Sequence, residues 1–201
     1  MSIFNFTDEQ SLGEVRSVET SRITVRVTDG QRLQKARVGR LVAIQSMGDE
    51  WLIGIIERVW RHPVELPTLP EADPPADLAG VPQEENGVSI SLVGTYRARD
   101  GQRKDTFTRA VFILPEINRP VFPIEEKSLE DFMGILSASS KADAAAPLKV
   151  GTYTLDGKAS AYIDGDKLFQ RHAALLGSTG SGKSFTVASI LEQSAQLPHA
   201  N

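Results

Sequence analysis

The stretch GSTGSGKS, residues 177–184, decides how the C-terminal part of this 201-residue chain folds. It fits G-x-x-x-x-G-K-[ST], the pattern of a phosphate-binding P-loop. The apolar run at residues 173–176 precedes it and predicts a short, buried parallel strand. Apolar residues at three- and four-residue spacing then predict a helix over residues 183–196, which Pro198 ends. The order of strand, glycine loop and helix is the context that this motif requires.

The residue types in the loop suit phosphate chemistry. Its glycines let the backbone curl with N–H groups pointing inward, and the helix dipole adds attraction for phosphate oxygens. Lys183 is expected to reach the β- and γ-phosphates, and the Ser184 hydroxyl is placed to ligate Mg²⁺. The predicted ligands are therefore ATP and Mg²⁺. The predicted site consists of Gly177, Ser178, Thr179, Gly180, Ser181, Gly182, Lys183 and Ser184.

The composition is that of an ordinary globular protein, with 40% hydrophobic and 24% charged residues. The formal net charge of −4 neither favours nor excludes nucleic acid, because a ring-shaped motor needs only a few basic groups around its pore. The absence of cysteine excludes disulfides and cysteine-ligated zinc. No signal peptide or membrane-length apolar run is present in the sequence, so we expect a cytoplasmic protein without membrane contact.

The N-terminal part has the pattern of β-strands. Ile23, Val25 and Val27 alternate with polar residues, which predicts a strand with one buried face. Denser apolar runs at residues 41–44, 51–56, 88–96 and 107–114 predict further strands. About six strands over residues 12–115 indicate a small barrel. Six of the eleven prolines fall within residues 62–87, where we expect a solvated loop.

The middle of the chain is predicted to link the barrel to the P-loop. Ser128 resembles the N-cap of a short helix through Leu136, and a small, polar linker follows. Residues 149–154 and 159–163 predict a hairpin across Asp156-Gly157. We therefore expect three parts: a β-barrel domain at 1–125, a helix and linker at 126–148, and the start of an ATPase domain at 149–201. The fold class is a mainly β barrel followed by the first βα unit of an α/β, RecA-like P-loop domain.

Two groups of basic residues are candidates for contact with a nucleic-acid backbone. A solvated loop tip or a subunit contact explains such groups more often. The first group surrounds the Asp100 turn and the second follows the Asp29-Gly30 turn. The first group consists of Arg97, Arg99, Arg103, Lys104 and Arg109. The second consists of Arg32, Lys35, Arg37 and Arg40.

The barrel together with RHAALLGSTGSGKS, residues 171–184, resembles the HerA family of ATPases, relatives of the FtsK translocases. The N-terminal part is similar to the HAS barrel that precedes the motor in that family, with residues 38–42 and 54–59 resembling two of its strands. Residues 162–168, with Arg171 and His172, resemble the lead into the family's P-loop. The resemblance covers essentially the whole chain, and the P-loop is its most specific part.

This resemblance implies a homo-hexameric ring that hydrolyses ATP and moves double-stranded DNA through its centre. It implies a nuclease or NADase-type effector docked on the barrel, in DNA-end processing or antiphage defence. Lys183 would be the catalytic residue on the phosphates, and Ser184 would hold the metal. Hydrolysis also requires an acidic strand and an arginine, which the residues up to Asn201 do not supply. We therefore expect the N-terminal portion of a longer protein, inactive by itself, in which residues 172–201 are poorly ordered or packed on the preceding hairpin or another chain.

Two alternatives stay open on the sequence alone. The barrel could act as a non-catalytic module for assembly or effector docking, since its pattern is complete. The loop could also belong to a different P-loop enzyme, such as a conjugative coupling ATPase or a kinase with an N-terminal β-domain, because unrelated reactions share this motif.

Overall fold

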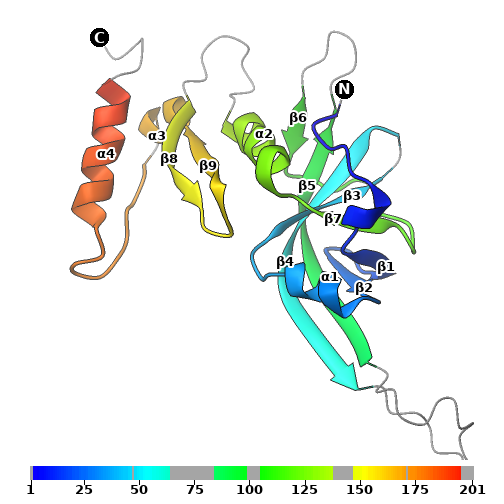
Figure 1. Ribbon diagram of the computed structural model, residues 1–201. Helices are drawn as coiled ribbons and strands as arrows, with labels where there is room; N and C mark the ends of the chain where they lie inside the picture. The colour runs from blue at the N-terminus through cyan, green and yellow to red at the C-terminus, as the bar shows by residue number, and fades with distance from the viewer. Residues whose placement is uncertain are drawn as a thin grey trace, which may run out of the picture. The chain divides into compact units, whose positions relative to one another are not determined.

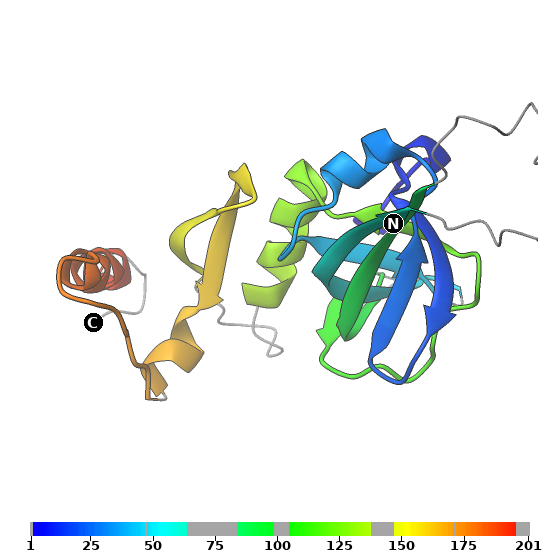
Figure 2. The ribbon, with the colours of Figure 1, turned by 90° about the horizontal axis from the view of Figure 1, so that it is seen from below.

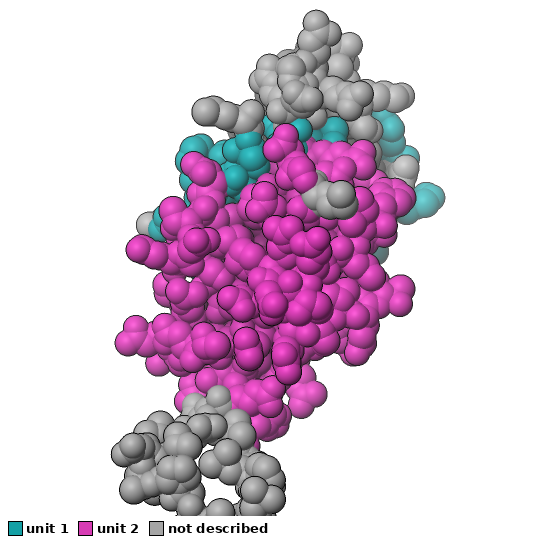
Figure 3. Space-filling view, turned by 90° about the vertical axis from the view of Figure 1, so that its right-hand side faces the viewer, with its two compact units in different colours: residues 1–4, 98–107, 124–201 teal, residues 5–97, 108–123 magenta. Residues whose placement is uncertain are grey.

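The computed structural model describes residues 2–46, 48–63, 84–98, 105–137, 147–170 and 172–195. The chain divides into two compact units, coloured separately in Figure 3. The barrel unit comprises residues 5–97 and 108–123, and the second unit comprises residues 1–4, 98–107 and 124–201. The domain bounds expected from the sequence remain a prediction. None of the helices in the described ranges is both long enough and apolar enough to span a membrane.

Six antiparallel strands close into the expected small barrel (Figures 1 and 2). Their order around the barrel is β2-β1-β7-β3-β4-β5, and β5 pairs back onto β2. Closure leaves the body of the barrel without an open edge, which removes a site of unwanted strand pairing. Among the described strands, the end of β4, residues 58–63, pairs only with β5. The strands are β1 (Gly13–Val18), β2 (Arg22–Arg26), β3 (Leu41–Gln45), β4 (Glu50–Pro63), β5 (Glu84–Arg97) and β7 (Pro120–Pro123). A short strand, β6 (Thr106–Thr108), joins the sheet next to β5.

The barrel interior is filled by the apolar residues that alternate along each strand. Val15, Ile23 and Val25 are fully buried, as the alternation in the sequence predicts. An aromatic cluster of Phe6, Trp51 and Phe122 covers part of this core. Phe6 stacks on Phe122 with ring centroids 4.8 Å apart, and Trp51 meets both rings edge-on. These large side chains supply much of the apolar area that stabilises the barrel.

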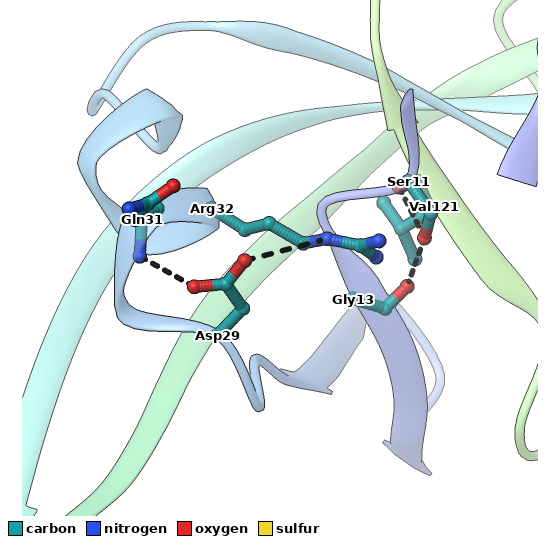
Figure 4. Close-up of polar contacts among 6 residues, drawn as sticks. All are labelled: Ser11, Gly13, Asp29, Gln31, Arg32 and Val121. Atoms are coloured by element: carbon teal, nitrogen blue, oxygen red, sulfur yellow. Dashed lines mark hydrogen bonds and ion pairs between the residues drawn. The ribbon is translucent and has the colours of Figure 1, made fainter. Parts of the chain in front are cut away.

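A short helix, α1 (Gly30–Lys35), follows β2 where the sequence predicted only a turn. The Asp29 carboxylate caps it by accepting the Gln31 N–H at 2.8 Å, and it lies 3.9 Å from the Arg32 guanidinium (Figure 4). Leu33 is the one residue of α1 that is buried in the barrel core. A helix with a single apolar contact has no periodicity that a sequence pattern can reveal.

The prediction of a strand at residues 107–114 is wrong. Only Thr106–Thr108 is strand, and Phe112 is 72% exposed with Ile113 and Leu114 also exposed. The sixth strand of the barrel is instead β7, which pairs with β1 and β3. The Ser11 hydroxyl, just before β1, donates to the Gly13 carbonyl at 3.0 Å and reaches the Val121 carbonyl at 3.5 Å (Figure 4).

The proline-rich segment is partly strand. β4 runs to Pro63 and β5 begins at Glu84, so the two strands extend into the range predicted as a loop. Residues 64–83 of that predicted loop lie outside the described residues.

The second unit contains α2 (Glu126–Ser137), the hairpin of β8 (Pro147–Tyr153) and β9 (Asp156–Asp164), α3 (Gly165–Gln170) and α4 (Lys183–Ala195). The predicted hairpin is confirmed, although its turn is at Thr154 and Leu155. The predicted N-cap at Ser128 is wrong, because α2 begins two residues earlier. The Asp156 carboxylate, thirty residues along the chain, accepts the Glu126 N–H at 2.5 Å. Most of the predicted linker, residues 138–146, lies outside the described range.

Candidate functional site

The predicted P-loop is an exposed turn that leads directly into α4. Gly180 has a φ of +82° and Gly182 a φ of +85°, which side-chain-bearing residues rarely adopt. A Cβ on Gly177 would lie 2.5 Å from the Ser181 hydroxyl, so that exposed side chain would have to turn away. Ser178 accepts the Ser181 N–H at its carbonyl, 3.2 Å away, which closes the turn. Gly180 and Gly182 therefore each have a conformational reason in the loop itself.

The first turn of α4 presents a row of donors. The Thr186 N–H is bonded to the Gly182 carbonyl at 3.0 Å. The N–H groups of Lys183, Ser184 and Phe185 make no hydrogen bond to any part of the chain that the structure describes. Unbonded N–H groups at the positive end of a helix attract anions. This end of α4 is thus suited to phosphate oxygens.

The Lys183 ammonium lies against the loop that the phosphates would enter. Nζ donates to the Gly177 carbonyl at 2.7 Å and to the Ser178 carbonyl at 2.5 Å. Both acceptors are in the first two residues of the motif, so the side chain folds back along the loop rather than into solvent. A phosphate in the loop would offer charged oxygens to the same ammonium, and hydrogen bonds between charged groups are the stronger kind.

The Ser184 hydroxyl is exposed and bonds to none of the described residues. A single hydroxyl at this position fits Mg²⁺, which is commonly held by few protein ligands together with phosphate oxygens and water. Within the described ranges, His, Cys, Asp and Glu form no group of three that could hold a metal ion by itself. Ser184 therefore stays the predicted ligand for a nucleotide-bound magnesium ion. Ser178, Thr179 and Ser181 are exposed around it and complete the predicted octet.

The strand predicted before the loop is not formed. Residues 172–178 carry no strand hydrogen bonds, and Leu176 is 89% exposed. A parallel strand exists only beside a neighbouring strand, and the described residues provide none for this segment. The helix after the loop does form as predicted, over Lys183–Ala195. Helix α4 contacts β8, so it packs on the preceding hairpin, which was one of the outcomes expected.

The apolar stripe predicted along α4 is only partly covered. Ile190 and Ser194 are half-buried, whereas Val187 and Leu191 are exposed. Sequence reasoning did not single out Phe185, which is 80% exposed on the first turn of the helix. Its position directly after the motif is the feature of the sequence that could have indicated a role for Phe185.

The two basic groups are engaged within the barrel or only partly described. Arg97 pairs with Glu50 at 2.7 Å, and Arg32 lies near Asp29. The Arg40 guanidinium donates to the Lys35 carbonyl at 3.0 Å. Arg99, Arg103 and Lys104 lie outside the described residues. Lys35, Arg37 and Arg109 are exposed, and contact of either group with nucleic acid remains a prediction.

The segment that contains this loop matches a known protein family. Residues 148–201 match the family described as helicase HerA, central domain. The chain carries a HerA-like ATPase segment. The resemblance found in the sequence is thereby confirmed, and the closed barrel before the HerA-like segment is consistent with it. No curated protein matches the chain.

Proposed function

We propose that this protein is part of a HerA-like, ATP-driven translocase of double-stranded DNA that works as a homo-hexameric ring. The observation that carries the proposal is the loop at residues 177–184. The loop combines the Lys183 ammonium with three N–H groups that bond to none of the described residues, within the segment that matches the HerA central domain. ATP with Mg²⁺ is the ligand that this donor set fits.

Each group in the loop has a distinct role in this proposal. The N–H groups at the start of α4 hold the phosphate chain in place. Lys183 would neutralise charge on the β- and γ-phosphates as the terminal phosphoryl group passes to water, and Ser184 would help to hold Mg²⁺, which would supply further positive charge to the phosphates. All eight residues of the octet are assigned to nucleotide binding, and Lys183 is the catalytic residue among them.

The proposal predicts ATP hydrolysis that depends on duplex DNA. In the full-length protein with Mg²⁺, linear double-stranded DNA is expected to raise the rate of phosphate release severalfold. The protein is also expected to displace a third strand from a triplex in ATP but not in ADP, since only a moving motor strips a bound strand. Triplex displacement that is equal in ATP and ADP, or hydrolysis that ignores duplex DNA, would contradict translocation.

A second candidate function, docking of an effector on the barrel, is favoured by an exposed apolar stretch between β6 and β7. Phe112, Ile113, Leu114 and Ile117 are exposed within six residues of each other, and all belong to the barrel unit. Soluble proteins seldom leave contiguous large apolar side chains uncovered, and such patches often mark partner sites. A nuclease or NADase-type effector is the partner we propose for this stretch.

Polar replacement of this stretch tests the docking role. In the Phe112→Ser, Leu114→Ser double variant, co-purification with a co-expressed nuclease or NADase from a neighbouring gene is expected to fall about tenfold or more, because each buried apolar side chain contributes roughly 1.5–3 kcal/mol. Val38→Ser is the matched control, since Val38 is exposed on the same unit outside the stretch. Equal partner recovery from the double variant and the control would exclude this surface.

A further inference from the structure

Phe185 is an exposed aromatic residue beside a phosphate-binding loop. It follows Ser184 on the first turn of α4, and 80% of its surface is accessible. Phe185 does not belong to the face of α4 that packs. The half-buried positions are Lys183, Thr186, Ser189, Ile190, Gln193 and Ser194. The contact of α4 with β8 therefore leaves the phenyl ring uncovered.

Helix geometry directs this ring toward the loop. In an α-helix every Cα–Cβ bond tilts toward the N-terminus, so a side chain covers the surface over the preceding turn. The turn before Phe185 is the glycine loop itself. The backbone N–H of Phe185 is also one of the three unbonded donors there. One residue thus offers a donor for a phosphate oxygen and an apolar surface next to it.

We infer that the Phe185 ring packs against the nucleoside part of the nucleotide whose phosphates occupy residues 177–184. Phosphate groups gain nothing from a phenyl ring, whereas the base and the ribose have apolar faces that aromatic side chains cover in many binding sites. This inference rests on the proposed nucleotide binding and adds the place where the nucleoside, as distinct from the phosphates, is recognised. The ring would then be covered when a nucleotide is bound.

Binding of two ligands by the full-length Phe185→Ala protein tests this assignment. Calorimetry with MgATP and with magnesium tripolyphosphate separates the nucleoside from the phosphate chain. The variant is expected to bind MgATP about tenfold more weakly, in line with the loss of one aromatic contact to a base. Its affinity for tripolyphosphate is expected to equal that of the parent. Phe185→Tyr retains the ring and is expected to restore MgATP binding.

The control is Leu191→Ala, which shortens another exposed apolar side chain of the same helix, and thermal unfolding checks that all variants fold equally. If Phe185→Ala binds both ligands like the parent, or loses both equally, the inference is overturned while the proposed function stands. If the parent protein binds neither MgATP nor tripolyphosphate, the proposed function fails and the inference fails with it.

Discussion

Replacing Lys183 with alanine is expected to lower the rate of ATP hydrolysis by the full-length protein at least about 100-fold, as removal of one preorganised charge from a reaction centre commonly does. The ammonium already lies within hydrogen-bonding distance of the Gly177 and Ser178 carbonyls. It therefore lies against the loop that we propose holds the phosphates. Phosphate release at saturating MgATP and duplex DNA measures the effect.

Lys149→Ala is the matched control for this variant, because Lys149 is an exposed lysine on β8 of the same unit. The barrel should unfold at the same temperature in both variants, since Lys183 lies outside the barrel unit. Parental hydrolysis by Lys183→Ala would refute the assignment of residues 177–184 as the hydrolytic site.

Truncating Phe122 to alanine is expected to lower the free energy of unfolding of the barrel by about 3–5 kcal/mol, the usual cost of emptying a large aromatic site in a core. Phe122 is 4% exposed and contacts the rings of Phe6 and Trp51. It also belongs to β7, the four-residue strand that joins β1 to β3. Urea unfolding followed by tryptophan fluorescence reports the change, because Trp51 is part of the cluster.

Phe112→Ala provides the comparison for Phe122→Ala, because it removes the same side chain from a position that is 72% exposed. Its expected effect on unfolding is within about 0.5 kcal/mol. A loss from Phe112→Ala as large as that from Phe122→Ala would show that the stretch between β6 and β7 is buried in the folded protein.

The sequence was informative about the barrel where burial follows a local pattern. The strands around Ile23, Val42, Ile53 and Ile90 show alternating or dense apolar runs, and all four positions are core. The sequence did not predict β7, because this strand has only two apolar residues between Pro120 and Pro123. It also failed at Phe112 and its neighbours, because an apolar run carries no information on whether another chain or the same chain covers it.

The same distinction holds at the candidate site. The glycine conformations at Gly180 and Gly182 and the start of α4 depend on nearby residues, so the motif predicted them. The strand at residues 173–176 depends on a neighbouring strand, and it is not formed among the described residues. The cap on α2 comes from Asp156, thirty residues away, and no local pattern at Ser128 indicates it.

The position of Lys183 has a consequence for how tightly the loop holds its ligand. The ammonium has three donors, and two of them bond to the Gly177 and Ser178 carbonyls, so a phosphate that takes more than the third donor displaces one of these bonds. Part of the attraction between lysine and phosphate is cancelled by this exchange in the ground state. The remaining attraction between lysine and phosphate is strongest in the transition state, when negative charge on the phosphate shifts toward the leaving oxygens. Lysine in this loop should therefore contribute more to the speed of turnover than to the affinity for ATP.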